Sequence, residues 1–117
     1  MAPVVYAYSG CGTCRKALSW LKSRGIEPDV VPIRETPPSR QELEAALSQV
    51  GGLKSLFNAS GGDYKELGLK DKLSSLTQAQ ALDLLASRGN LVKRPFVRVG
   101  KRYLVGFQEP AWEEAFR

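Results

Sequence analysis

The chain has 117 residues, enough for one domain with a single hydrophobic core, and its composition is that of an ordinary globular protein. No apolar run approaches the roughly 18 residues of a membrane-spanning helix, so we expect no membrane span. The net charge of +5 comes from scattered basic residues without interleaved aromatic ones. We therefore expect a solvated basic surface and no direct nucleic-acid binding, although this charge suits an acidic partner or an oxyanion.

The first predicted element is a strand, and the only two cysteines of the chain follow it. Pro3 to Tyr8 is short, apolar and rich in Val and Tyr, which is typical of a strand. Cys11 and Cys14 come next, and the apolar residues of Arg15 to Lys22 recur at helical spacing. The CxxC segment is therefore predicted to lie where a strand ends and a helix begins.

A CxxC at a helix start favours redox chemistry. Unpaired N–H groups and the macrodipole stabilise an anion there, so a cysteine thiolate gains a lowered pKa. Cys11 lies just before the first turn and is the predicted nucleophile, and Cys14, one turn inside, is the predicted resolving thiol. We expect Gly10 and Gly12 to let the chain turn tightly and leave Cys11 uncovered. Gly12 and Thr13 are candidate substrate-binding residues.

Three other interpretations of the cysteine pair compete with redox use. A structural disulfide would close a very short loop and restrict the unfolded chain by only about 2 kcal/mol. A zinc site normally has four ligands, and the chain has no histidine and no further cysteine. Two inert buried thiols are the third possibility. The strand–CxxC–helix context favours redox use over all three, and without a histidine base the thiol must be activated by the helix end and nearby positive charge.

The middle of the chain is predicted to be helical. Asp29 to Ile33 is the second predicted strand and completes a β-α-β unit. Capping-box patterns at 39–42 and 77–80 each open a helix, which we expect to end at Gly51-Gly52 and at Gly89, respectively. Shorter helical pieces are expected at 53–57 and 63–67. These elements predict a helical insertion at about 39–88.

The last third returns to strands. Phe96 to Val99 alternates like a strand, Gly100-Lys101 is a two-residue turn, and Arg102 to Val105 is the return strand. Glu109-Pro110 then opens a final short amphipathic helix, with Pro110 expected at its first position. The predicted order is β-α-β, a helical insertion, then β-β-α, within a single α/β domain over 1–117.

This order, with a CxxC after the first strand and Arg94-Pro95 opening the third, resembles the thioredoxin fold. The resemblance implies a mixed four-stranded sheet. It also implies that the Arg94-Pro95 bond is cis, that Pro95 lies beside the cysteines and shapes a substrate groove, and that Arg94 contacts an anion or a thiolate there. A surface ion pair is the alternative role for Arg94.

Finer motifs resemble the arsenate reductase (ArsC)/Spx/MgsR family over nearly the whole chain, including the insertion. They are CGTCRKA at 11–17, PPS at 37–39, LFN at 56–58, the segment 64–69 and LVKRP at 91–95. As a set these motifs are specific to that family, although no single one is.

Arsenate reductases of this family use one catalytic cysteine, which Cys11 matches, and three arginines that hold the oxyanion. Arg94 matches one of these arginines. The second would fall where this chain has Asn58, and no arginine occurs near the third position, around 105–107. Those reductases also commonly have serine where this chain has Cys14. The resemblance therefore predicts weak or absent arsenate reduction.

Spx and MgsR proteins share the CxxC and use it as a redox switch. They bind the C-terminal domain of the RNA polymerase α subunit and redirect transcription. By resemblance, a redox-sensing regulator that uses Cys11 and Cys14 as its switch is the main alternative to an enzyme.

The sequence thus predicts a thiol–disulfide oxidoreductase that uses a CxxC pair and binds no cofactor. Glutathione with glutaredoxin, or thioredoxin, is the expected reductant, and a redox partner protein or thiol is the expected partner. Because the thiols look reactive and Met1-Ala2-Pro3 leads directly into the first strand without a signal peptide, we expect a cytoplasmic location. We also expect a monomer.

Overall fold

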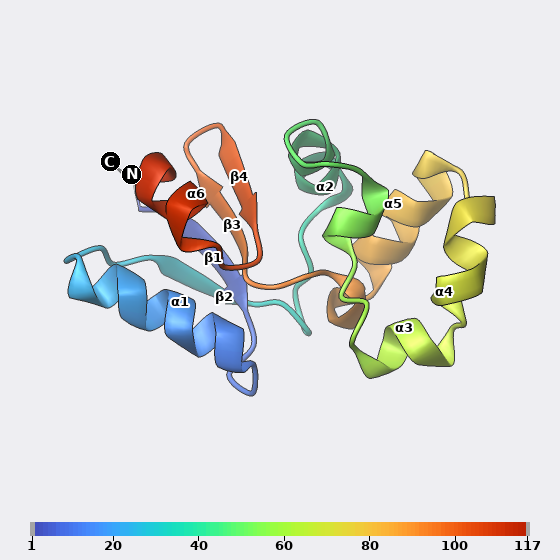
Figure 1. The fold of residues 1–117 in the computed structure, drawn as a ribbon, viewed down its shortest axis with the longest axis horizontal. Helices are drawn as coiled ribbons and strands as arrows, with labels where there is room; N and C mark the ends of the chain where they lie inside the picture. Colours follow the sequence, from blue (N-terminus) through green and yellow to red (C-terminus); the bar gives the residue numbers. More distant parts are fainter. Residues whose placement is uncertain (1, 117) are drawn as a thin grey trace.

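The computed structural model describes residues 2–116, and it is built on a mixed four-stranded sheet (Figure 1). The strand order is β2-β1-β3-β4, with β1 parallel to β2 and antiparallel to β3, and β3 antiparallel to β4. The bounds are β1 Val4–Ala7, β2 Asp29–Pro32, β3 Phe96–Val99 and β4 Arg102–Val105. The predicted α/β, thioredoxin-like architecture is confirmed. Residues 1 and 117 of the expected domain span lie outside the described residues.

Helices occupy the predicted places and add pieces that the sequence did not reveal. The α-helices are α1 Gly12–Ser23, α2 Arg40–Leu47, α3 Gly62–Glu66, α4 Leu69–Lys72, α5 Gln78–Ser87 and α6 Glu109–Ala115. The 3₁₀ helices are η1 Leu53–Leu56, η2 Leu73–Ser75 and η3 Gly89–Leu91. All elements from α2 to η3 lie between β2 and β3 in the chain and gather beside the sheet (Figure 1). None of the helices within residues 2–116 is long and apolar enough to cross a membrane.

The two faces of the sheet pack against different helices, as strand alternation requires. Val5 and Val97 point to the face covered by α1 and α6, where they pack with Leu21 and Trp112. The opposite face, which includes Tyr6 and Phe96, packs against the core of the insertion. The two groups of helices therefore pack on opposite faces of the same sheet, and the loop that follows β1 connects the sheet to α1.

Several predicted helix ends shift. Helix α2 ends at Leu47, before Gly51-Gly52, and Pro110 is the second residue of α6, not the first. Gly89 follows α5, but its conformation is not the left-handed one that ends many helices. A Cβ atom on Gly89 would lie 1.7 Å from the carbonyl oxygen of Ile33. This glycine is needed because the insertion packs directly against the main chain after β2.

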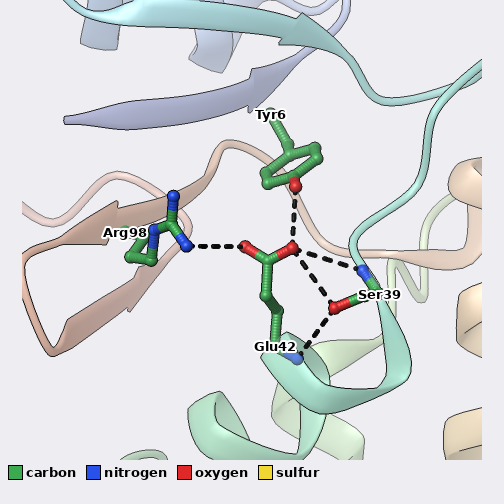
Figure 2. A network of polar contacts seen from close by, with 4 residues as sticks. All are labelled: Tyr6, Ser39, Glu42 and Arg98. Atoms are coloured by element: carbon green, nitrogen blue, oxygen red, sulfur yellow. Dashed lines mark hydrogen bonds and ion pairs between the residues drawn. The ribbon is translucent and has the colours of Figure 1, made fainter. Parts of the chain in front are cut away.

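A carboxylate joins the insertion to the sheet (Figure 2). Tyr6 of β1 donates from its hydroxyl to Glu42 Oε1 at 2.8 Å, and Arg98 Nη1 of β3 lies 3.9 Å from Glu42 Oε2. Glu42 also completes the predicted capping box: its backbone N–H donates to Ser39 Oγ at 3.1 Å, while Ser39 N donates to Oε1 at 3.4 Å. One side chain thus caps α2 and fixes it to two strands.

Candidate functional site

Cys11 is the N-cap residue of α1, immediately after the turn that follows β1. Its backbone N–H donates to the carbonyl of Tyr8 at 3.0 Å, and its Sγ accepts from the backbone N–H of Cys14 at 3.3 Å. Arg15 closes the turn by donating from Nη1 to the carbonyl of Ser9 at 2.9 Å. The sulfur therefore takes the place of a capping oxygen and receives one of the unpaired helix donors.

The two thiols have opposite pKa shifts. Partial burial raises the pKa of Cys11, but hydrogen bonding from Cys14 and the positive charge of Arg94 outweigh it, and the net pKa is lowered. Burial raises the pKa of Cys14 to about 12, and its interaction with Cys11 contributes in the same direction. Cys14 is buried and Cys11 is half-buried. Cys11 therefore loses its proton at lower pH than Cys14 does.

Arg94 lies beside Cys11 because of the chain's path into β3. The Arg94-Pro95 bond is cis, which confirms the prediction, and the carbonyl of Pro95 accepts from the backbone N–H of Gly106 at 2.9 Å. The Arg94 guanidinium lies 5.4 Å from the centre of the Tyr8 ring, which Arg34 also contacts at 4.6 Å. Arg94 Nη1 is buried and has no hydrogen-bond partner among residues 2–116. The surface ion pair considered for Arg94 does not occur within this range.

The two glycines around Cys11 differ in what they permit. A Cβ atom on Gly10 would lie 2.5 Å from Cε2 of the Tyr8 ring, so Gly10 is needed for space. A Cβ atom on Gly12 would meet only the end of the Arg15 side chain, at 3.9 Å. Neither glycine has a positive φ, so the expected tight turn does not depend on glycine conformations.

Cys11 opens into a cavity of about 430 Å³. Of the predicted site residues, Cys11, Thr13 and Arg94 line this cavity, and Gly12 lines a neighbouring hollow. Pro95 and Cys14 are buried and do not line it. The lining residues that the sequence analysis did not propose as ligands are Tyr8, Gly10, Ser60, Gly61, Lys93 and Gln108. These residues come from four separate segments, 8–10, 60–61, 93 and 108, and no spacing in the sequence marks the segments as neighbours.

Asn58 lies in the cavity wall because two segments of the insertion pair with each other. The Asn58 N–H donates to the carbonyl of Leu91 at 2.7 Å, and the Lys93 N–H donates to that of Leu56 at 2.8 Å. This pairing aligns residues 56–58, which follow α2 and η1, with the segment before Arg94. Gly106 and Phe107 line the cavity as well. Both positions where the family's arginines were sought thus face the cavity, but in this chain neither carries a charge.

The arrangement brings together a thiol of lowered pKa, a thiol of raised pKa and an arginine that takes part in no ion pair within residues 2–116. No group of three or more His, Cys, Asp or Glu side chains within residues 2–116 is arranged to hold a metal ion. The chemistry that these side chains support by themselves is nucleophilic attack by sulfur.

The sequence was compared with known protein families and proteins. The model of the ArsC family matches residues 6–115. The uncharacterized protein YusI of Bacillus subtilis is 46% identical over 97% of this chain and 98% of its own. An arsenate reductase of Rhizobium meliloti is 37% identical over 83% of this chain and 69% of its own. The regulatory protein MgsR of Bacillus subtilis is 29% identical over 87% of this chain and 80% of its own.

A solved structure extends the likeness to three dimensions. The crystal structure of an ArsC family related protein from Bacteroides fragilis superposes with a TM-score of 0.92 and covers 98% of each chain at 39% identity.

Proposed function

This chain belongs to the ArsC family, and we propose that it is a thiol–disulfide oxidoreductase whose nucleophile is Cys11 and whose resolving thiol is Cys14. The observation that carries the proposal is the opposite pKa shift of the two cysteines at one helix start. A lowered pKa raises the thiolate fraction of the half-buried Cys11 above that of an ordinary cysteine, and a raised pKa keeps the buried Cys14 protonated.

The proposed reaction transfers two electrons from the cysteine pair to a substrate disulfide. The Cys11 thiolate attacks one substrate sulfur, a Cys11–substrate disulfide forms, and the other substrate sulfur leaves as a thiolate. Cys14 then loses its proton to the departing thiolate and attacks Cys11 Sγ, which releases the second substrate sulfur as a thiolate that takes a proton from solvent. The products are two substrate thiols and a Cys11–Cys14 disulfide, and an external thiol, such as glutathione with glutaredoxin or thioredoxin, would reduce this disulfide.

The order of attack follows from the charges. While Cys11 is a thiolate, it raises the pKa of Cys14 through its charge and through hydrogen bonding. Once Cys11 is part of a mixed disulfide, its negative charge is gone. The Cys14 pKa should then fall, although burial still holds it up, so the resolving thiol becomes reactive only after the first step.

The test compares single serine variants with a neutral substrate, bis(2-hydroxyethyl) disulfide. Cys11→Ser should abolish exchange, and Cys14→Ser should accumulate a mixed disulfide at Cys11 that mass spectrometry detects. The pH dependence of alkylation by iodoacetamide should give a midpoint below the ~8.5 of a free cysteine for Cys11. Equal residual exchange in both variants, or faster alkylation of Cys14 than of Cys11, would reject the proposed roles.

A redox-sensing regulator is the second candidate, favoured by the similarity to MgsR. The same cysteine pair would then switch binding to the C-terminal domain of the RNA polymerase α subunit. A pull-down with that domain, on the reduced and the oxidised protein, separates the candidates: binding that depends on oxidation state supports the regulator, and exchange without binding supports the oxidoreductase.

Arsenate reduction is a third candidate because several relatives carry that name. We expect it to be weak or absent, since Asn58 faces the cavity where a charged bidentate partner would hold an oxyanion. An assay with glutathione and glutaredoxin tests this expectation, and turnover equal to that of a dedicated arsenate reductase would contradict it.

A further inference from the structure

We propose that the groove leading from Cys11 along the edge strand β4 binds an extended acidic peptide segment of the disulfide partner. This inference rests on the proposed thiol–disulfide exchange and adds a substrate class to it. The observation behind it is a second hollow of about 400 Å³ that shares Lys93, Gly106 and Gln108 with the Cys11 cavity. The two hollows are therefore adjacent, and the second follows β4 as far as Arg102.

The charges along this path all have one sign. Among the residues that line the two hollows, the charged ones are Lys93, Arg94 and Arg102. Lys93 is exposed and takes part in none of the ion pairs found within residues 2–116, while Arg102 Nη2 lies 3.6 Å from Glu114 Oε1. That pair is exposed on both sides, so it holds Arg102 only weakly. A carboxylate entering the groove would meet cations and no acidic wall.

The backbone of β4 favours an extended peptide over a small acid. The Gly106 N–H donates to the carbonyl of Pro95, and the Tyr103 N–H donates outward to Gln49 Oε1 at 2.8 Å. Because inward and outward groups alternate along an antiparallel strand, the N–H and C=O of Val105 point outward, toward the groove that Val105 lines. An extended segment can pair with such an edge.

The Gln49 side chain covers the first part of the β4 edge. Its amide nitrogen donates to the carbonyl of Lys101 at 2.8 Å while its oxygen accepts from Tyr103, so one side chain covers this part of the strand. The uncovered edge lies between that amide and the Cys11 cavity. Arg102 is three residues from Val105, roughly 10 Å along the strand, so its side chain can meet a peptide carboxylate that a compact thiol bound at Cys11 would not reach.

The test uses synthetic peptides in which one cysteine forms a mixed disulfide with 2-mercaptoethanol. Three peptides differ only in the flanking residues, which are Glu, Gln or Lys, and glutathione disulfide serves as a compact acidic substrate. The Glu peptide should react about three- to tenfold faster than the Gln peptide at low salt, and the advantage should shrink at high salt. The Lys peptide should be the slowest.

The variants locate the effect. Lys93→Gln should reduce the advantage of both acidic substrates, whereas Arg102→Gln should slow the Glu peptide and leave glutathione disulfide unchanged. Lys22→Gln is the matched control, because it removes the same charge from the exposed last turn of α1, outside the groove. It should leave the preference intact.

The outcomes separate this inference from the proposed function. Equal rates for the Glu and Gln peptides, or no effect of Arg102→Gln on the Glu peptide, overturn the acidic groove even when bis(2-hydroxyethyl) disulfide is reduced normally. Failure to reduce that neutral disulfide overturns the oxidoreductase instead. The groove then remains testable by fluorescence anisotropy, with a labelled Glu peptide carrying serine for cysteine and the Cys11→Ser protein: binding weakened by Lys93→Gln supports the groove, and no binding rejects it.

Discussion

Glu42 and Arg94 are both partly buried, but they differ in the polar groups that surround them. Glu42 receives hydrogen bonds at Oε1 from Tyr6 and from Ser39; its Oε2 is buried without a hydrogen-bond partner within residues 2–116, but it lies 3.9 Å from Arg98 Nη1, in an ion pair (Figure 2). Arg94 stacks near Tyr8, and its buried Nη1 has no hydrogen-bond partner within residues 2–116. Donors from two strands and from the start of a helix surround Glu42. Arg94 instead faces the cavity and Cys11.

The difference indicates different uses. A partly buried charge with an ion-pair partner and hydrogen-bond donors of its own holds elements together, and removing it leaves those partners unpaired. A partly buried charge that takes part in no ion pair within residues 2–116, as Arg94 does, has interaction capacity that the fold does not use, which is typical of a functional site. We therefore expect Glu42 to control stability and Arg94 to control the reactivity of Cys11. The predictions below test this division, in order of the expected change in the free energy of unfolding.

The largest change should come from Glu42→Ala. It removes the capping box of α2 and leaves the Tyr6 hydroxyl and Arg98 without their carboxylate, which should lower the free energy of unfolding by about 2–3 kcal/mol. Urea unfolding followed by circular dichroism measures this. Glu44→Ala, on the exposed side of the same helix, is the matched control and should change stability by no more than about 0.5 kcal/mol. The division fails when the two variants are equally stable, or when Glu42→Ala shifts the Cys11 alkylation midpoint in the folded protein.

A smaller change should come from Tyr6→Phe, which removes one partner of Glu42 and keeps the ring. We expect a loss of about 1 kcal/mol at pH 7, since a single hydrogen bond is removed. Burial, together with the hydrogen bond to Glu42 and its charge, raises the pKa of Tyr6 to about 12. In the unfolded chain the pKa of tyrosine is near ~10.

The raised pKa of Tyr6 predicts a pH dependence. The stabilisation is fully present below the unfolded-state pKa and is lost as the pH rises through the folded-state pKa. The difference in stability between the wild type and Tyr6→Phe should therefore shrink between about pH 10 and 12. Unfolding curves at several pH values measure it, and a difference that stays constant across this range would contradict the assignment.

The sequence predicts most of the fold, but not the contacts that distinguish Glu42 from Arg94. The alternation of strands, the capping boxes at Ser39 and Thr77 and the strand–CxxC–helix order gave the architecture, because these signals are local. Helix α4 and two of the 3₁₀ helices were missed because each is three or four residues long, too short for a periodic pattern. Gly89 follows the end of α5, as predicted, but its close contact with the distant carbonyl of Ile33 could not be derived from the sequence.

The same limit applies to the site. Cys11, Cys14 and Arg94 could be named because they belong to compact motifs, and the structure brings them together. The long-range contacts could not be derived: nothing in the spacing of Tyr6, Glu42 and Arg98 indicates that three elements meet at one carboxylate. The positions of Lys93 and Gln108 in the cavity wall could not be derived either. Lys93 is positioned by the main-chain pairing before Arg94, and Gln108 by the path of the chain after β4.

The smallest change in stability, and the most specific change in chemistry, should come from Arg94→Gln. Removing a guanidinium that stacks on Tyr8 should alter the free energy of unfolding by about 0.5 kcal/mol, because no described ion pair is lost with it. The positive charge of Arg94 lowers the pKa of Cys11, so the variant should move the midpoint of Cys11 alkylation to higher pH. At neutral pH the variant should react more slowly with iodoacetamide, and at high pH, where Cys11 is fully a thiolate in both proteins, the rates should converge.

Arg40→Gln is the control variant. It also removes one positive charge, but Arg40 is paired with Asp83 and does not line the Cys11 cavity, so the alkylation midpoint should not change. An unchanged midpoint in Arg94→Gln, or a loss of stability as large as that of Glu42→Ala, would place Arg94 with the structural charges and leave the helix start alone to activate Cys11.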